Sequence, residues 1–293
     1  TCLVIKVVLT GSSGLLGSSL KKISFDQGTI ILSINYSSAW EPDFPKKLKC
    51  LQASFFIHAA ANTDVEWCEM NPNECYYDNY LLTDRIAQIC AEIELPLLYL
   101  SSTGVYGKQQ MIPYKEYNAA LPTTHHHRSK YLGEKSVLIA NKKNLVVRTG
   151  WLFGGNSSQK KNFVWNRIRE ALVAKKSNLP IFSNNEQFGC PTFSDDLASQ
   201  LLLLMKGNYT GIFNIVSEGN ASRFDYVRSI INIANISVEI KKKPANEFNR
   251  KADVSNNEMA ENWKMKKLGI KQMPHWRDSL NFYISNIYKN YYE

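Results

Sequence analysis

Several features that mark whole classes of protein are missing from this sequence. No repeat at a solenoid or propeller period recurs in its 293 residues, and no low-complexity stretch indicates disorder. The apolar run at residues 3–9 is broken by Lys6 and is too short for a signal segment or a membrane span. We therefore expect a globular protein with no membrane partner, long enough for one large domain or for a large and a small one.

Paired cysteines are missing as well. None of the six cysteines belongs to a Cys-x-x-Cys pair or another metal-like spacing, so reduced thiols in a cytoplasmic protein are the simplest interpretation. The three histidines at 125–127 would face different directions at a helix start, and no cysteine or carboxylate cluster accompanies them. We therefore expect no metal site. The cysteines are Cys2, Cys50, Cys68, Cys75, Cys90 and Cys190.

Acidic residues are outnumbered by basic ones. Lysine and arginine total 35 against 26 aspartates and glutamates, which gives a net charge of +9. Such a charge is compatible with nucleic acid, anionic lipid or a phosphorylated small molecule as partner. The basic residues are scattered, with one triplet at 241–243, and they form no groove interleaved with aromatic residues. We therefore expect no nucleic-acid partner.

Apolar β-rich runs alternate with helical patterns through the first half of the chain. Strands separated by helices indicate βαβ units, and hence an α/β fold with a doubly wound parallel sheet, the Rossmann arrangement. The predicted strands are residues 3–9, 29–34, 55–61, 95–100 and 145–148, and the predicted helices are residues 79–93 and 127–141.

Beyond Trp151 the alternation weakens, which indicates a smaller C-terminal substrate-binding lobe. We expect a substrate to lie in the cleft between this lobe and the first domain. Helical patterns follow at 163–175 and 195–205, with extended segments at 179–182 and 212–216 and an amphipathic stretch at 276–291. The predicted first domain is residues 1–154 with 188–217 returning to it, and the predicted lobe is residues 155–187 and 218–293.

Three glycines follow the first predicted strand at a spacing of three. Gly11, Gly14 and Gly17 precede a helical pattern, the position in which glycines permit a tight turn and close approach of the backbone to a pyrophosphate. The helix N-terminus that follows favours an anion. The spacing therefore predicts a dinucleotide-binding loop, although an ordinary turn can show the same pattern.

The residue that would contact the adenosine ribose is Asn35, at the end of the second predicted strand. An aspartate there would favour NAD and a nearby arginine NADP, and the sequence has neither. A neutral amide does not repel a 2′-phosphate, so we expect NADP or NAD with NADP preferred. Asn35 as a plain turn residue is equally compatible with the sequence.

Nine short motifs occur in an order that resembles the extended short-chain dehydrogenase/reductase superfamily, and most closely its dTDP-4-dehydrorhamnose reductase branch. Each motif is weak alone, but together they cover nearly the whole chain. The motifs are Thr10-Gly-x-x-Gly-x-x-Gly, His58-Ala-Ala-Ala, Asp64-Val-Glu-Trp-Cys-Glu-Met-Asn-Pro72, Asn79, Leu100-Ser-Ser-x-x-Val-Tyr-Gly107, Arg128-Ser-Lys-x-x-Gly-Glu134, Arg148-Thr-Gly-Trp-Leu-Phe-Gly154, Phe188-Gly-Cys-Pro-Thr-Phe-Ser-Asp-Asp-Leu-Ala198 and Trp276-Arg-Asp-Ser-Leu280.

The resemblance implies roles for particular residues of this chain. Ser102 would donate a hydrogen bond to the substrate carbonyl, Lys130 would bind the nicotinamide ribose, and Trp151 would contact the sugar. Ser102 as a strand-end hydroxyl and Trp151 as a core side chain are the alternatives. The implied cofactor-binding residues are Gly11, Gly14, Gly17, Asn35, Ala59, Ala60, Ala61, Asn79 and Lys130.

His126 departs from the family pattern, because the family places its catalytic tyrosine four residues before the lysine. That tyrosine protonates the substrate oxygen as hydride reaches the carbon. The Lys130 charge should lower the pKa of His126 and so disfavour an imidazolium that could act as an acid. Its donor would also lie about 2 Å short of a phenol oxygen, where a misplacement of about 1 Å can cost on the order of a hundredfold in rate. A neutral N–H or an intervening water could still relay a proton.

Another pair of residues, Tyr131 and Lys135, also has the Tyr-x-x-x-Lys spacing. The motif Arg-Ser-Lys-x-x-Gly-Glu fixes Lys130 in the family register, and a shift of five residues turns a helical side chain by about 140°. We therefore expect Tyr131 and Lys135 to point away from the cofactor, and His126 to occupy the catalytic position.

The function implied by the resemblance is NAD(P)H-dependent reduction of a 4-keto group on a nucleotide-linked deoxysugar, with Ser102, His126 and Lys130 at the reacting centre. The phosphates of the nucleotide-linked sugar would account for part of the positive charge of the protein. A homodimer or a partner enzyme is compatible with the sequence. At Arg250 the chain reads Arg-Lys-Ala-Asp and only partly follows the family's Arg-Pro-x-x-Ser segment at the sugar pocket. The alternative is a catalytically impaired NAD(P)-binding homologue that acts as a regulatory or structural subunit.

Overall fold

A computed structural model describes residues 4–26 and 28–288 of the chain. Within these residues, the main sheet has six parallel strands in the order β10-β5-β4-β3-β1-β2. The run predicted at 3–9 forms the first strand, although Leu3 lies outside the described residues. The strands are β1 (Ile5–Thr10), β2 (Thr29–Ser33), β3 (Phe55–His58), β4 (Leu97–Ser102), β5 (Leu145–Thr149) and β10 (Gly211–Asn214).

Both faces of this sheet are buried, as a doubly wound fold requires. Side chains alternate along each strand: Val7 and Leu9 of β1 contribute to one hydrophobic cluster, while Val8 between them contributes to the other. In β4 the neighbours Leu98 and Tyr99 are divided between the two clusters in the same way. This explains why the strands read as continuous apolar runs rather than as alternating ones.

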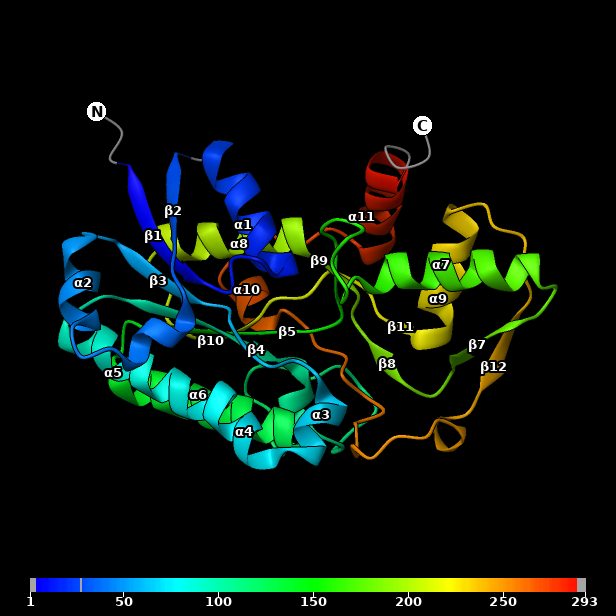
Figure 1. Cartoon of the computed structure of the whole chain (residues 1–293), viewed down its shortest axis with the longest axis horizontal. Helices are drawn as coiled ribbons and strands as arrows, with labels where there is room; N and C mark the ends of the chain where they lie inside the picture. Colours follow the sequence, from blue (N-terminus) through cyan, green and yellow to red (C-terminus); the bar gives the residue numbers. More distant parts are fainter. Residues whose placement is uncertain (1–3, 27, 289–293) are drawn as a thin grey trace.

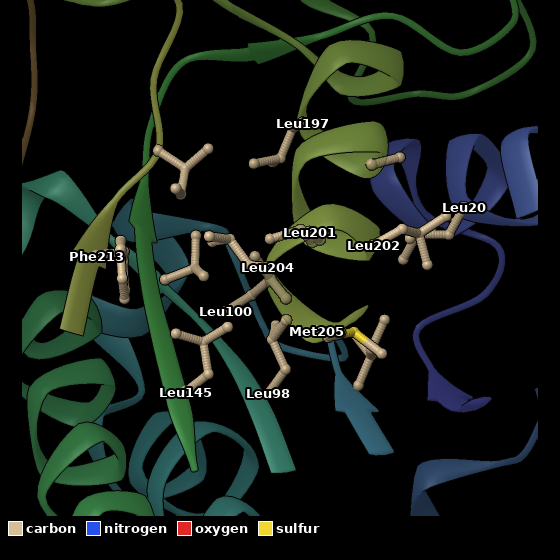
Figure 2. Close-up of a cluster of buried hydrophobic side chains, with 14 of the residues drawn as sticks. Leu20, Leu98, Leu100, Leu145, Leu197, Leu201, Leu202, Leu204, Met205 and Phe213 are labelled. Carbon is tan, nitrogen blue, oxygen red and sulfur yellow. The ribbon is translucent and has the colours of Figure 1, made fainter. Parts of the chain in front are cut away.

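Helices cover each face of the sheet (Figure 1). On one face lie α1 (Leu15–Asp26) and α8 (Ser194–Lys206), and Figure 2 shows Leu204 of α8 beside Leu98 and Leu100 of β4. On the other face lie α5 (Leu82–Glu92) and α6 (His125–Ala140). The predicted α/β doubly wound fold is therefore confirmed. No helix among the described residues is both long and apolar enough to cross a bilayer.

The strand order changes direction next to β1. The chain passes from β1 to β2 on one side and then returns to β3 on the other side of β1. In open parallel sheets the crevice at the carboxyl ends of such strands is where ligands bind. Gly11 follows β1 and Ala59 follows β3, so the predicted dinucleotide loop borders this crevice.

Later segments form a smaller lobe with its own hydrophobic cluster, which includes Ile168, Tyr226, Trp276 and Leu280. Two segments beyond Trp151 do not belong to this lobe. The strand β10 is part of the main sheet, and the helix α8 packs on one face of that sheet. The predicted domain boundaries stay a prediction. The elements of the lobe are α7 (Phe163–Lys176), β7 (Ile181–Asn184), β8 (Phe188–Gly189), β11 (Ala221–Ser222), α9 (Arg223–Ile233), β12 (Ile240–Lys243), η4 (Ala245–Glu247), α11 (Trp276–Tyr283) and η5 (Ile284–Tyr288).

Several short elements were not predicted as separate elements, because each has too few residues to show a helical or strand period, and the predicted helix 79–93 covers part of one of them. Asp64 nevertheless caps one of them by accepting the backbone N–H of Trp67 at 2.9 Å, and Pro72 begins the next. These elements are η1 (Tyr36–Trp40), α2 (Phe44–Cys50), α3 (Val65–Met70), α4 (Pro72–Tyr76), η2 (Tyr77–Leu81), η3 (Thr103–Tyr106), β6 (Leu152–Phe153), β9 (Thr192–Phe193) and α10 (Trp263–Lys267).

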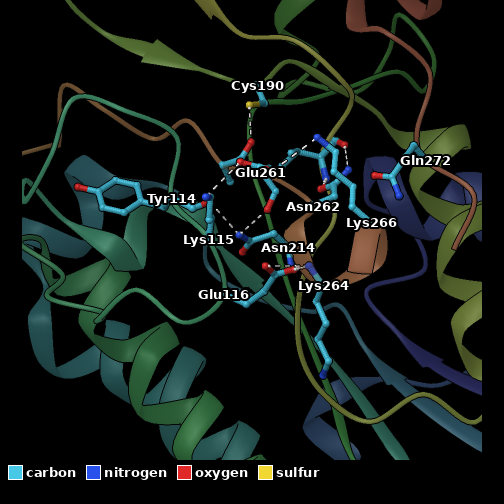
Figure 3. A network of polar contacts seen from close by, with 12 residues as sticks. Tyr114, Lys115, Glu116, Cys190, Asn214, Glu261, Asn262, Lys264, Lys266 and Gln272 are labelled. Carbon is cyan, nitrogen blue, oxygen red and sulfur yellow. Dashed lines mark hydrogen bonds and ion pairs between the residues drawn. The ribbon is translucent and has the colours of Figure 1, made fainter. Parts of the chain in front are cut away.

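A polar network at the end of β10 ties the C-terminal part of the chain to the sheet (Figure 3). Asn214 donates from Nδ2 to the carbonyl oxygens of Tyr114 and Glu261, each at 3.1 Å. Its Oδ1 accepts the hydroxyl of Tyr106 at 2.7 Å. The side chain of Glu116 accepts the backbone N–H groups of Asn214 and Lys264. Residues 261–264 are thereby held beside β10 and beside the segment at 106–116, which follows β4.

Candidate active site

The three glycines of the loop after β1 have different physical reasons to be glycine. Gly11 has φ +77°, and a Cβ there would lie 2.7 Å from the backbone of Ala59. A Cβ at Gly17 would lie 2.2 Å from the carbonyl oxygen of Gly11. A Cβ at Gly14 would meet only that same oxygen, at an ordinary 3.4 Å. Internal packing therefore requires the first and third glycines, while the second leaves room for a ligand, as a pyrophosphate loop does.

A pocket of about 320 Å³ opens beyond the carboxyl ends of β2 and β3, where Tyr36 and Ala60 line it. Ala60 and Ala61 line it, whereas Ala59 packs against the glycine loop, and contact of these alanines with an adenosine stays a prediction. Its position and lining fit a dinucleotide. The residues that line it are Tyr36, Ala60, Ala61, Asn62, Asp78, Leu82 and Lys161.

Asn35 caps the turn after β2. Its Oδ1 accepts the backbone N–H of Ser37 at 3.1 Å, which is the turn role that the sequence left open. Its neighbour Tyr36 lines the pocket, as does Lys161 from the distant loop after β6. Sequence reasoning missed both residues. The position of Tyr36 just after a strand end was a usable signal, but nothing local indicated Lys161.

Ser102 lies at the carboxyl end of β4, opposite Thr149 of β5. Its Oγ accepts the backbone N–H of Gly104 at 3.1 Å and so begins the turn η3. The side chain is partly exposed. Because this bond uses a lone pair of the Ser102 oxygen, the hydroxyl proton of Ser102 remains available for a ligand.

Helix α6 carries His126, Lys130 and Glu134 on one face, at intervals of one turn. Thr124 caps the helix by accepting the backbone N–H of His127. At the far end of this face, Glu134 forms a two-point contact with Arg148 of β5, at 2.7 and 3.0 Å. This buried ion pair fixes the helix against the sheet and so sets the position of the other two side chains.

Lys130 is buried without a hydrogen bond or ion pair to any described residue. Its side chain is 5% exposed, and its Nζ lies 4.2 Å from the centre of the Tyr99 ring in β4. Burial lowers the pKa of Lys130 to about 7, against the opposing charge of Glu134. An ammonium held over a ring, with unused donors, is suited to bind hydroxyl groups of a ligand.

His126 is buried at the start of the same face, with 6% of its surface exposed. Its Nδ1 lies 3.0 Å from the carbonyl oxygen of Asn62, and a carbonyl can only accept. The same Nδ1 lies 3.5 Å from Nδ2 of Asn79, and the shorter contact with the carbonyl favours the neutral ring that carries its proton on Nδ1. Burial lowers the pKa of His126 well below its usual value, and the charges of His127 and Lys130 lower it further.

Asn79 holds the loop that His126 contacts. Its Oδ1 accepts the backbone N–H of Asn62 at 2.8 Å, and its Nδ2 donates to the carbonyl of Asn62 at 3.0 Å. Nδ2 also donates to Ser129 of α6. Asn79 thus links the pocket loop to the helix. A direct contact of Asn79 with a cofactor stays a prediction.

The alternative pair, Tyr131 and Lys135, lies elsewhere on α6. Lys135 is exposed, with its Nζ 4.6 Å from the centre of the Tyr131 ring. By contrast, Lys130 packs against the sheet. The helix therefore presents His126 and Lys130, not Tyr131 and Lys135, toward the carboxyl edge of the strands.

Trp151 follows β5 with an unusual backbone, φ +49°. Its Nε1–H donates to Oε2 of Glu258 at 2.7 Å, and the guanidinium carbon of Arg223 lies 3.4 Å from its ring centre. A Cβ at Gly189 would lie 2.3 Å from Cε2 of the ring. The partly exposed indole is thus held on several sides. No local signal pointed to Arg223 or Glu258, because both come from the distant lobe.

No three His, Cys, Asp or Glu side chains within residues 4–26 and 28–288 lie close enough together to hold a metal ion. The histidines diverge: His126 contacts Asn62, while His127 bonds through Nδ1 to Thr124. The described cysteines are free thiols, and Cys2 lies outside the described residues.

Comparisons with known proteins agree with this geometry. The family described as RmlD substrate binding domain matches residues 5–289. A dTDP-4-dehydrorhamnose reductase of Mycobacterium tuberculosis (strain ATCC 25618 / H37Rv) is 28% identical over 283 residues, which cover 94% of this chain and 91% of the relative.

Solved structures show the same architecture. A dTDP-4-dehydrorhamnose reductase from Yersinia enterocolitica superposes with a TM-score of 0.86 at 27% identity, covering 96% of this chain and 99% of its own. The dTDP-4-dehydrorhamnose reductase of Bacillus anthracis str. Ames, solved in complex with NADP, gives a TM-score of 0.87 at 24% identity, with coverage of 96% and 99%.

The family match extends over nearly the whole chain, as the ordered motifs do. It includes the glycine loop, the pocket beyond β2 and β3 and helix α6 with Lys130. The chain therefore belongs to the RmlD family of the extended short-chain dehydrogenase/reductase superfamily, as its motifs predicted.

Proposed function

We propose that this protein is an NADP(H)-dependent reductase of a 4-keto, nucleotide-linked deoxysugar, with His126 in the position of the family's catalytic tyrosine. The relatives named dTDP-4-dehydrorhamnose reductase support the substrate class. The observation that carries the proposal is Lys130, whose buried ammonium has no hydrogen bond to a described residue. Such a group has a reason to stay in the core if a ligand's hydroxyls complete its hydrogen bonds.

The chain's own residues suit a nicotinamide cofactor, which would supply the hydride. The space at Gly14 and the pocket at Ala60 and Ala61 would hold its pyrophosphate and adenosine. The neutral Asn35 and the positive charge of Lys161 favour NADP over NAD, as does the NADP bound to the Bacillus anthracis relative.

Two groups would position the substrate carbonyl. The hydroxyl proton of Ser102 would donate to the carbonyl oxygen and stabilise the charge that develops there. The indole of Trp151, fixed by Glu258, would bound the sugar. Lys130 would orient the cofactor ribose beneath them.

Delivery of the proton is the step that His126 alters. With its proton on Nδ1 and donated to Asn62, the neutral ring has an unprotonated Nε2, which is an acceptor. The proton must then come from a water molecule or from Lys130, whose pKa of about 7 suits an acid at neutral pH.

The unprotonated Nε2 of His126 also favours a second candidate function. In this candidate the protein is a catalytically impaired NAD(P)-binding homologue that serves as a regulatory or structural subunit. In this function the glycine loop and Lys130 bind the cofactor, and the proton donor is dispensable. The two candidates agree on cofactor binding and differ only in turnover.

The test measures binding and turnover separately. NADPH and NADH are titrated into the wild-type protein, and oxidation of NADPH is then followed with a dTDP-linked 4-keto deoxysugar. We expect NADPH to bind more tightly than NADH, and turnover in the wild type. Binding without turnover, with activity appearing in His126→Tyr, would overturn the reductase proposal and support the second candidate.

Two variants complete the experiment. His126→Phe removes both ring nitrogens, so loss of turnover in this variant would assign the imidazole a part in the reaction. Tyr131→Phe is the matched control, because Tyr131 lies away from the carboxyl edge of the strands, and its turnover should equal that of the wild type.

A further inference from the structure

Arg223, the first residue of α9, lies on the indole of Trp151 at the edge of the candidate active site. Its guanidinium carbon is 3.4 Å from the Trp151 ring centre and 5.0 Å from that of Phe163. Stacking of this kind fixes the plane of a guanidinium and leaves its edges free to donate. The side chain is partly exposed, so a ligand can reach it.

This guanidinium has no partner of opposite charge within the described residues. No ion pair joins it to a carboxylate, and its side chain makes no hydrogen bond there; only its backbone N–H is bonded, to Gln187. Glu258, whose charge stabilises it, is itself bonded to Trp151. The burial of Arg223 lowers its pKa to about 10. A partly desolvated guanidinium whose N–H donors have no acceptor is unfavourable, so an anionic ligand that accepts from them would stabilise this arrangement.

Two further features surround Arg223. Tyr226 is 1% exposed, and its hydroxyl has no hydrogen-bond partner in the described part of the chain. Its ring is stacked on Phe163 at 5.2 Å, against the same side chain that Arg223 contacts. In addition, Arg167 and Arg250 lie close enough for their charges to oppose that of Arg223. Cations gathered in this way favour a ligand with more than one negative charge.

The place of Arg223 relates it to the reacting centre. Ser102 lies opposite Thr149 in the sheet, and Trp151 follows two residues later in the chain. Arg223 therefore contacts a side chain that follows the strand end paired with Ser102. A substrate carbonyl at Ser102 and an anion at Arg223 can belong to one ligand that passes Trp151.

We propose that Arg223 binds the diphosphate of the nucleotide-linked substrate, with Trp151 as the platform that fixes its guanidinium plane. The inference rests on the proposed function for the identity of the substrate. The planar fork of arginine matches two phosphate oxygens at once, which the compact ammonium of lysine does not. Thymidine diphosphate is the simplest probe, because it carries the diphosphate without the sugar.

The experiment measures binding of thymidine diphosphate, thymidine and NADPH to the full chain by calorimetry. The wild type should bind thymidine diphosphate, and Arg223→Gln should weaken this affinity on the order of 10- to 100-fold. Binding of NADPH should stay unchanged, and so should any binding of thymidine, which has no phosphate. Arg223→Lys keeps the positive charge but loses the planar guanidinium. We therefore expect a smaller decrease, of about fivefold, in the affinity for thymidine diphosphate.

Arg228→Gln is the matched control, because Arg228 is exposed on the same helix and paired with Asp225. Its affinity for thymidine diphosphate should equal that of the wild type. Equal affinity in Arg223→Gln and the wild type, or no binding of thymidine diphosphate by the wild type, would overturn the inference. If Arg223→Gln does not fold, an affinity of Arg223→Lys for thymidine diphosphate equal to that of the wild type would also overturn the inference.

Failure of the proposed function is distinguishable from failure of this inference. Arg223-dependent binding of thymidine diphosphate without turnover of the 4-keto sugar would contradict the reductase and support the diphosphate site. Turnover with a KM that Arg223→Gln leaves unchanged would support the reductase and contradict the site. A KM that rises in Arg223→Gln while kcat is retained supports both.

Discussion

The Nδ1 atom of His126 lies 3.0 Å from the carbonyl oxygen of Asn62. Asn79 fixes that carbonyl by bonding both the N–H and the oxygen of Asn62. The ring that we propose stands in the family's tyrosine position therefore has one nitrogen committed as a donor and the other left as an acceptor. A tyrosine in that position would offer an acidic proton, whereas this imidazole offers a lone pair.

This tautomer can be observed by nuclear magnetic resonance. We expect the His126 ring to carry its proton on Nδ1 and to stay neutral at pH 6, because burial holds its pKa well below the usual 6.5. The signal is assigned as the one that His126→Phe removes. A proton on Nε2, or a titration midpoint near 6.5, would contradict this arrangement.

The buried Lys130 should make stability depend on pH. Its pKa is about 7 in the folded protein and near 10.5 when exposed, so the unfolded state binds more protons between these values. Stability should therefore rise with pH in this window, by up to about 1.4 kcal/mol per pH unit.

The measurement for Lys130 is chemical denaturation at several pH values from 7 to 10, with Lys130→Met as the reference. The difference in unfolding free energy isolates the lysine, because other titrating groups are common to both proteins. We expect the apolar variant to be the more stable one at pH 7 and this advantage to shrink as the pH rises. A difference independent of pH would show that Lys130 keeps its ordinary pKa.

Substitutions at two glycines of the loop after β1 should affect folding and NADPH binding differently. Gly17→Ala places a Cβ 2.2 Å from the carbonyl oxygen of Gly11 and should destabilise the fold by about 1–3 kcal/mol. Gly14→Ala meets nothing closer than 3.4 Å, so its thermal midpoint should match that of the wild type. NADPH binding to Gly14→Ala should nevertheless weaken, by about 1–3 kcal/mol in free energy. Unchanged NADPH affinity in this variant would place the pyrophosphate elsewhere.

The buried pair of Glu134 and Arg148 should be among the most sensitive positions in the chain. Glu134→Gln leaves the Arg148 charge without its carboxylate in a site where both side chains are almost fully buried. We expect a loss of about 3–5 kcal/mol in unfolding free energy, measured by urea denaturation. Arg228→Gln, which breaks an exposed pair, should cost at most about 1 kcal/mol. Similar losses of unfolding free energy in Glu134→Gln and Arg228→Gln would show that burial does not make the Glu134–Arg148 pair more sensitive than an exposed pair.

Much of the fold was predictable because its signals are local. The apolar runs that form β1, β4 and β5 and the glycine spacing after β1 each reflect contacts within a short stretch of chain. The short helices α3 and α4 were missed, since they have no full period to read. The N-cap residue Asp64 of α3 and the proline that begins α4, Pro72, were the available signal.

The sequence by itself determined the sheet, the dinucleotide loop and the register that places His126 and Lys130 on one face of α6, because a strand run and a helical interval of four residues are properties of neighbouring positions. The tertiary structure alone decided which nitrogen of His126 holds the proton and that Arg223 lies on Trp151. Both depend on segments far apart in the chain, whose contacts are set by packing and burial rather than by local pattern.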